Sequence, residues 1–213
     1  MSNSKGVRNT VIVLILVMIA SVAGVVHKIM TPQLLSTEEL AKHGIIYFDA
    51  PREIRPFKLN NQDGKIADNS VFEGKWSLVF FGFTHCPDVC PTTLSDLARF
   101  HMKLPDSLKS KIQIVFVTLD PARDDSASMK KYLHYFDPSF IGLEGDFLET
   151  MKFARNLNVA FNKVQLAGGD YTIDHSANII IVNPRGQYQG FLNLRKDPQV
   201  TLKILGEQLS HLR

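Results

Sequence analysis

Residues 80–91 read Phe-Phe-Gly-Phe-Thr-His-Cys-Pro-Asp-Val-Cys-Pro and contain both cysteines of the 213-residue chain. The apolar run over residues 76–83 predicts a buried strand that ends just before the first cysteine. Pro91 suits the first position of a helix, so a helix is expected from there to about Leu104, with Cys90 as its N-cap. A helix N-terminus favours the thiolate, the form of cysteine that attacks disulfides and binds metals.

The rest of the chain alternates short apolar runs with amphipathic segments. The other expected strands are residues 45–48, 111–119, 140–143 and 177–182, and the other expected helices are residues 126–136, 146–157 and 199–212. Hairpins are expected around Asp63-Gly64 and between residues 159–166 and 171–173. This order indicates an α/β sandwich around a mixed sheet. A strand, cysteines and a helix inside a βαβ unit are typical of the thioredoxin-like class, here with an N-terminal hairpin extension.

The N-terminal segment reads as one transmembrane helix. Residues 9–26 carry no charge, which is just long enough to cross a bilayer. Lys5 and Arg8 precede the run, so we expect a cytoplasmic N-terminus and an exported body. A cleaved signal peptide is the competing interpretation, because Ser21-Val22-Ala23 resembles a cleavage site. The apolar run continues past that site and favours an uncleaved anchor.

Charge and cysteine content narrow the class of protein. The chain has 24 Lys and Arg against 21 Asp and Glu; without Lys5 and Arg8 the balance is 22 against 21, a net charge of +1. This gives no electrostatic footprint for nucleic acid. Two closely spaced cysteines in so long a chain indicate a site and exclude a disulfide-rich scaffold. The expected division is residues 1–30 as membrane anchor, 31–44 as tether and 45–213 as the thioredoxin-like domain.

Two thiols at Cys86 and Cys90 allow two kinds of chemistry. They can exchange a disulfide, or they can share a soft ion such as Cu(I). The spacing suits both, and a third ligand would decide. His85 is adjacent to a cysteine, but neighbouring residues of an extended chain point to opposite faces. His175 precedes a late core strand, where a thioredoxin-like fold faces the cysteine turn; it reads equally as a metal ligand or as a loop residue bonded to Asp174.

Four motifs together resemble the Sco/SenC family, membrane-anchored copper proteins that help assemble cytochrome c oxidase. They are Gly-Phe-Thr-His-Cys-Pro-Asp-Val-Cys-Pro at 82–91, Thr-Leu-Asp-Pro-Ala-Arg-Asp at 118–124, Phe-Ile-Gly-Leu-Glu-Gly at 140–145 and Asp-His-Ser-Ala at 174–177. The resemblance runs from about residue 56 to residue 182. It implies a thioredoxin-like fold and a copper site in which Cys86, Cys90 and His175 bind Cu(I) or Cu(II).

The resemblance also implies a role and a location. The expected role is that of a metallochaperone rather than an enzyme. It would receive copper from an upstream donor chaperone and deliver it to the binuclear copper site of cytochrome c oxidase subunit II. The expected location is the inner (cytoplasmic) membrane, with a single pass and the domain in the periplasm. Asp120 matches an acidic position of the family motif, but its residue chemistry suggests only a strand-end residue. Arg123 and Asp124 are expected to form a loop ion pair.

Two alternatives use the same cysteines. The first is a membrane-tethered thiol–disulfide reductase acting on the cysteines of the same oxidase subunit, with His175 only adjusting the thiol pKa. Its weaknesses are the three-residue spacer between the cysteines and the absence of a proline between Pro138 and Pro184. The second is a peroxidase of the peroxiredoxin kind, which shares the arrangement Thr84 to Cys86 and predicts rapid reaction with peroxide.

Overall fold

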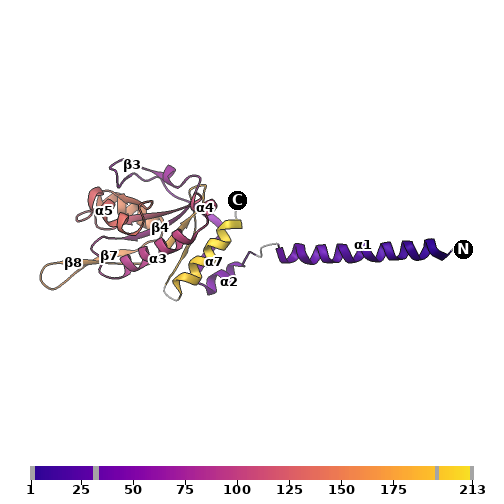
Figure 1. Cartoon of the computed structure of the whole chain (residues 1–213). Coiled ribbons are helices and arrows are strands. Elements are labelled where there is room, and N and C mark those ends of the chain that lie inside the picture. The colour runs from indigo at the N-terminus through magenta and orange to yellow at the C-terminus, as the bar shows by residue number, and fades with distance from the viewer. Residues whose placement is uncertain (1–2, 31–33, 195–196, 212–213) are drawn as a thin grey trace. The chain divides into compact units, whose positions relative to one another are not determined.

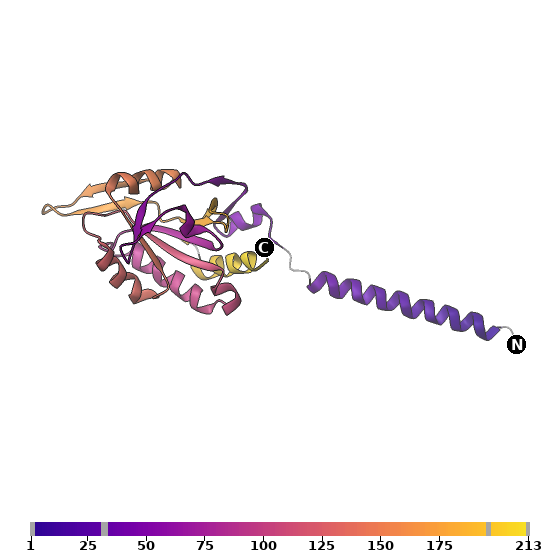
Figure 2. The same cartoon turned by 90° about the horizontal axis from the view of Figure 1, so that it is seen from above.

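The computed structural model of the chain describes residues 3–30, 34–194 and 197–211 (Figures 1 and 2). The chain divides into two compact units between Leu34 and Leu35. The first unit is helix α1, Asn3–Met30. Its segment Gly6–Val26 is long and apolar enough to cross a membrane, and every side chain in that segment is exposed. The predicted N-terminal apolar helix is therefore present.

The second unit begins with helix α2, Thr37–Lys42. Ser36 and Glu39 form a reciprocal capping box at its N-terminus, which satisfies backbone donors that the helix leaves free. Leu40 is buried, and α2 packs against the first strand of the sheet. The segment predicted to be a tether is thus folded from Leu35 onward, and residues 31–33 lie outside the described residues.

The body is built on an eight-stranded mixed sheet of order β1-β10-β9-β4-β5-β6-β2-β3, with β7 and β8 as a separate two-stranded ribbon. The strands are β1 Ile45–Glu53, β2 Leu59–Asn61, β3 Ile66–Ala67, β4 Trp76–Gly82, β5 Ile112–Thr118, β6 Ile141–Glu144, β7 Phe161–Gln165, β8 Tyr171–His175, β9 Ile179–Val182 and β10 Gln187–Leu192. Strand β5 pairs in parallel with β4 and β6, and the remaining pairs are antiparallel.

Helices cover both faces of the central strands. The remaining helices are α3 Val89–Lys103, α4 Asp106–Lys109, α5 Ser126–Phe136, α6 Phe147–Asn156 and α7 Pro198–His211, with a 3-10 helix at Asn69–Phe72. On one face, Phe116 of β5 meets Tyr132 of α5; on the other, Phe81 of β4 meets Phe153 of α6. Strands β4 and β5 are buried along their whole length, which explains their continuous apolar sequence.

The structure confirms the predicted α/β sandwich and its N-terminal hairpin, β2–β3, which pairs with β6. Strand β10 and helix α4 are not among the predicted elements, and two boundary differences matter for the sheet and the site. Strand β1 continues to Glu53, well beyond the predicted residue 48. Helix α3 begins at Val89 with Asp88 at the N-cap, so the prediction of Cys90 as N-cap is wrong. Pro91 is tolerated at the third helical position because the first four helical N–H groups have no partner within the helix. Cys90 therefore lies inside the first turn.

Candidate metal centre

The two cysteines lie where β4 passes into α3. Cys90 is completely buried, and Cys86 is half-buried in the preceding loop. The backbone N–H of Cys90 donates a hydrogen bond to Cys86 Sγ at 3.4 Å, and both cysteines are free thiols. Gly82 makes room for this packing: a Cβ there would lie 2.8 Å from Cys90 Sγ and 2.9 Å from the Phe116 ring. A side chain at Gly82 would therefore displace the buried sulfur.

His175 ends strand β8 and turns its ring toward the cysteines. Its Nε2 lies 3.7 Å from Cys90 Sγ, across 85 residues of sequence. Its Nδ1 lies 3.0 Å from the carbonyl oxygen of Ser176, which can only accept, so Nδ1 donates. This hydrogen bond leaves Nε2 with a free lone pair on the side of the sulfurs. Such an outer hydrogen bond fixes ring orientation and tautomer in metal-binding histidines.

The two thiols differ in charge. The pKa of Cys86 is lowered to about 4, first because the Cys90 side chain hydrogen-bonds to its thiolate. Burial opposes this shift, whereas the nearby His175 side chain and the backbone N–H groups of Asp88 and Cys90 add to it. The pKa of Cys90 is raised, first because its thiol proton is held by Cys86 and second because it is buried. The reduced site thus holds one thiolate, one thiol and one imidazole.

This donor set suits a soft cation. Thiolate and imidazole are ligands that Cu(I) prefers. Donors bonded to one ion at about 2.3 Å for sulfur and about 2.0 Å for nitrogen lie at most about 4.3 Å apart, and the Cys90–His175 separation of 3.7 Å falls within that limit. Over the described residues, no group of three His, Cys, Asp or Glu side chains already surrounds a common point. Binding of an ion would therefore require the three donors to move closer together.

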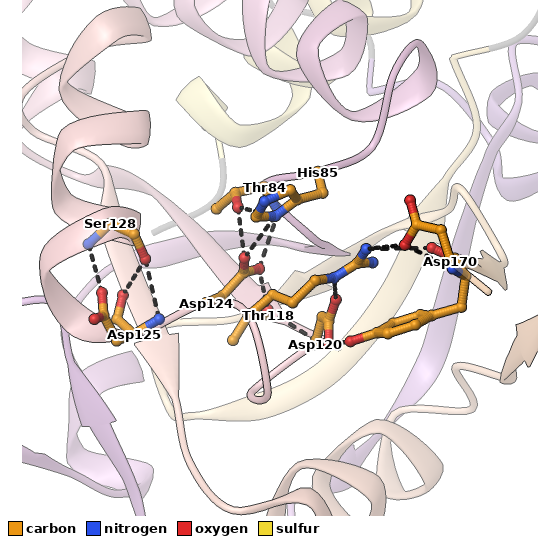
Figure 3. Close-up of polar contacts among 10 residues, drawn as sticks. Thr84, His85, Thr118, Asp120, Asp124, Asp125, Ser128 and Asp170 are labelled. Carbon is orange, nitrogen blue, oxygen red and sulfur yellow. Dashed lines mark hydrogen bonds and ion pairs between the residues drawn. The ribbon is translucent and has the colours of Figure 1, made fainter. Parts of the chain in front are cut away.

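His85 contacts Thr84 and Asp124. Its Nδ1 lies 3.1 Å from Thr84 Oγ1 and 3.6 Å from Asp124 Oδ1 (Figure 3). The ring is more than half exposed, whereas the Asp124 carboxylate is fully buried. His85 thus belongs to the polar contacts that support the cysteine loop.

Asp124 is the residue whose role the sequence analysis missed. Its carboxylate accepts hydrogen bonds from the Thr84 backbone N–H at 2.9 Å, from the Thr84 hydroxyl, and from the Thr118 hydroxyl at 2.6 Å (Figure 3). The expected loop ion pair between Arg123 and Asp124 is wrong. A buried carboxylate requires donors, and threonines at the ends of two adjacent strands supply them. The occurrence of threonines near the ends of two neighbouring strands, together with an acidic residue, was the sequence feature that could have predicted this role of Asp124.

A second network ties the ribbon that carries His175 to the loop after β5. Asp120 accepts a hydrogen bond from the Tyr171 hydroxyl at 2.8 Å and one from Arg123 Nε (Figure 3). The Arg123 guanidinium also stacks on the Tyr171 ring at 3.8 Å. Asp120 is buried, so this charge is compensated within the fold. The acidic strand-end residue thereby gains a structural role, which is to hold the first residue of β8.

Sequence relatives agree with this geometry. Residues 48–210 match the family described as SCO1/SenC. A Stutzerimonas stutzeri protein provisionally named as copper-binding is 35% identical over 153 residues, which cover 72% of this chain and 75% of that protein. The mitochondrial SCO2 protein of Saccharomyces cerevisiae is 35% identical over 156 residues, 72% of this chain and 52% of that protein. The chain spans about half the length of the mitochondrial relatives it matches.

Solved structures share the fold. Copper-bound ScoI of Bradyrhizobium japonicum has a TM-score of 0.65 and 38% identity, covering 72% of this chain and 97% of that one. Copper-bound yeast Sco1 has a TM-score of 0.68 and 32% identity, covering 76% of this chain and 91% of that one. The family match spans most of the body and both strands that carry the cysteine turn and the imidazole. This chain belongs to the SCO1/SenC family.

Proposed function

We propose that Cys86, Cys90 and His175 bind one copper ion and that the chain is a metallochaperone for the binuclear copper site of cytochrome c oxidase subunit II. The observation that carries the proposal is the approach of His175 Nε2 to Cys90 Sγ beside a second sulfur. The names of the relatives support copper as the cargo, since two similar Sco structures are described as copper-bound. A Sco protein of similar fold, 23% identical, is described as a cytochrome c oxidase assembly protein.

The difference in pKa between the two thiols predicts the order in which they bind copper. The Cys86 thiolate is the first donor, because its pKa is lowered to about 4. The incoming cation then displaces the proton of Cys90, whose thiol is otherwise held as the proton donor of the pair. Two thiolates, one neutral imidazole and Cu(I) give a net charge of −1. Three donors leave one coordination position open. A thiolate of the acceptor protein enters at that position and takes the ion by ligand exchange. The same sulfur and imidazole ligands also bind Cu(II).

We place the site on the outer side of the membrane. Helix α1 acts as a single-pass anchor in the inner (cytoplasmic) membrane, with Lys5 and Arg8 on the cytoplasmic side and the folded unit in the periplasm. An upstream donor chaperone supplies the copper. An oxidising compartment tends to join the thiols. Copper occupancy and disulfide formation are therefore competing outcomes at one site.

A copper titration tests the proposal. The full chain, reduced and held without oxygen in detergent, is titrated with Cu(I) against a competing chelator. We expect one ion per chain and a sharp loss of affinity in His175→Ala. His134→Ala is the matched control, because His134 is an exposed histidine on α5, remote in sequence from the site. Unchanged affinity in His175→Ala would exclude coordination by three ligands.

A second candidate function is thiol–disulfide reduction, which the contrast between the two thiol pKa values favours. The Cys86 thiolate would attack a substrate disulfide and form a mixed disulfide while one substrate thiolate leaves. Cys90 would then displace the second substrate thiol, leaving the substrate reduced and the protein oxidised. A reductase predicts that Cys90→Ser traps the mixed disulfide and that His175→Ala keeps turnover. A measured reduction potential beside the copper titration separates the two functions.

A further inference from the structure

A cavity of about 730 Å³ lies beside the ribbon that carries His175. We call this cavity the hairpin groove. It is bordered by the segment after β5, by helix α6 and by strands β7 and β8. The ribbon formed by β7 and β8 projects from the body in both views (Figures 1 and 2). Its apolar lining includes Leu119, Phe147, Met151, Val159, Phe161 and Ile173. Phe147 has 54% of its surface exposed and contacts the Phe161 ring edge-on. The groove thus combines buried apolar side chains with an exposed aromatic ring.

The exposed charged side chains that line the hairpin groove are positive. Arg155 and Lys163 line it, both are exposed, and neither has a carboxylate partner among the described residues. Lys163 Nζ lies 3.4 Å from the centre of the Tyr171 ring, which holds the ammonium over the groove wall. The acidic residue in the lining, Asp120, is buried, is ion-paired with Arg123 and accepts a hydrogen bond from the Tyr171 hydroxyl. An apolar floor with uncompensated cations favours an acidic, apolar occupant.

The groove wall is continuous with the candidate metal centre. Successive residues of a strand alternate between faces, so Tyr171, Ile173 and His175 lie on one face of β8. Their partners across the ribbon include Phe161, opposite His175, and Lys163, opposite Ile173. One face of the ribbon therefore carries both groove-lining residues and the imidazole. A molecule in the groove contacts the ribbon two residues from His175.

Two more exposed apolar side chains lie on or next to the elements that border the groove. Leu148 on α6 and Leu166, just after β7, have 58% and 48% of their surfaces exposed. Exposed apolar surface that is rimmed by polar groups is typical of protein–protein contact sites. Several apolar side chains spread over two elements suit a chain segment better than a compact small molecule, which pockets normally enclose. The occupant that fits is therefore a polypeptide.

We propose that the hairpin groove docks an extended segment of a partner protein in which carboxylates flank aromatic or aliphatic side chains. The apolar side chains would fill the space between α6 and the ribbon, while the carboxylates would meet Arg155 and Lys163. Docking there brings the partner to the ribbon that holds His175. The proposal does not depend on metal binding, since none of the groove residues is a candidate ligand.

Peptide selection on the full chain tests the proposal. The chain is placed in zwitterionic lipid nanodiscs, and a phage library of random twelve-residue peptides is selected against it. We expect acidic peptides with aromatic or aliphatic residues to be enriched. Measured singly by fluorescence anisotropy, they should lose affinity by about tenfold or more in a variant with Arg155→Glu and Lys163→Glu. Phe147→Ala should weaken the same peptides.

The matched control reverses two other exposed lysines. Lys58→Glu with Lys65→Glu introduces the same charge change at the β2–β3 hairpin, none of whose residues lines the groove, and should keep full affinity. Circular dichroism of each variant checks the fold. A variant with Cys86→Ser and Cys90→Ser should also bind normally, which separates docking from copper binding. The proposal is overturned if no such peptides are enriched, if they tolerate the groove reversal, or if the cysteine variant abolishes their binding.

Discussion

The cysteine loop and the histidine ribbon supply the two halves of the candidate metal centre, and they are held in different ways. Residues 83–88 connect a fully buried strand to a fifteen-residue helix, and the buried carboxylate of Asp124 fixes the loop through Thr84. The ribbon β7–β8 buries one of its ten residues, Ile173. Two-stranded ribbons are marginally stable alone. The sulfur half is therefore anchored in the core, whereas the imidazole half depends on local contacts.

This difference has a functional consequence. A site that must receive and release an ion benefits from one half that stays in place and one half that yields. Local opening needs little free energy where few apolar contacts hold a segment. We expect the ribbon to open while the cysteine loop keeps its structure. The following experiments separate the two halves, in order of decreasing effect.

The largest expected contrast is between the two thiols, because both shifts arise within the cysteine loop. In the reduced, metal-free chain, Cys86 should be alkylated by iodoacetamide at a rate that stays nearly constant from about pH 9 down to about pH 5, since its pKa is about 4. Cys90 should react far more slowly, since it is buried and its pKa is raised. Mass spectrometry of each modified peptide measures both rates.

Two variants test whether the cysteine loop or the histidine ribbon lowers the pKa of Cys86. Cys90→Ala removes the side-chain donor that is the first cause of the lowered pKa of Cys86, so the alkylation profile should move toward the ordinary thiol range. His175→Ala should move the profile less, because the His175 side chain is a smaller cause. A larger shift in His175→Ala than in Cys90→Ala would show that the ribbon controls the sulfur chemistry, and the comparison would fail.

The lowered pKa of Cys86 also predicts how the free energy of unfolding changes with pH. A depressed folded-state pKa stabilises the fold above the unfolded value, here 9.0, and this contribution is lost as the pH falls toward about 4. The raised pKa of Cys90 acts at the other end, because the unfolded chain deprotonates first and stability falls as the pH rises above 9.0. Urea unfolding of the reduced chain between pH 5 and pH 9 should therefore show a rising stability that is absent in Cys86→Ser.

The next largest effect is expected at Asp124. Asp124→Ala removes the acceptor of three hydrogen bonds and leaves the Thr84 amide and two hydroxyls without it. We expect a loss of about 2–4 kcal/mol in the free energy of unfolding. Because Thr84 precedes the cysteines, copper affinity should also fall about 10–100-fold, as for other residues that support metal ligands. Urea unfolding and copper competition measure the two effects.

The neighbouring carboxylate provides the control for Asp124. Asp125 is exposed and caps α5 through Ser128 (Figure 3). Asp125→Ala should cost about 1 kcal/mol, the usual effect of losing an N-cap, and should leave copper affinity unchanged. Equal losses of copper affinity in Asp124→Ala and Asp125→Ala would mean that Asp124 acts only through general stability.

The sequence predicts the fold well because its signals are local. The apolar runs of β4 and β5 and the turn at Asp63-Gly64 each specify an element without reference to distant residues. The start of α3 is predicted two residues late, because proline is allowed at several positions of the first helical turn. Such an error is small on the chain, yet it moves Cys90 from the helix end into the buried first turn.

The candidate site is less predictable, because its parts meet across the fold. The two cysteines are evident from their spacing, whereas the position of His175 follows only from the class of fold and the family resemblance. The pairing of Asp124 with Thr84 joins residues forty positions apart, and the pairing of Asp120 with Tyr171 joins residues fifty-one apart. Side-chain partners at such separation depend on strand order and register, which local patterns do not encode.

The smallest expected effect concerns the tie that holds the ribbon, and it tests the comparison most directly. Tyr171→Phe removes one hydrogen bond to Asp120 and keeps the ring that packs between the cations of Arg123 and Lys163. A hydrogen bond to a carboxylate contributes about 1.5–3 kcal/mol, so amide hydrogen exchange in β7 and β8 should become about tenfold or more faster. Exchange in α3 should not change, because the cysteine loop is anchored through Asp124. Tyr135→Phe, at a residue with 85% of its surface exposed, is the matched control. If exchange in α3 and in the ribbon rose together, the two halves would open as one unit, and release of the ion by movement of the imidazole alone would be excluded.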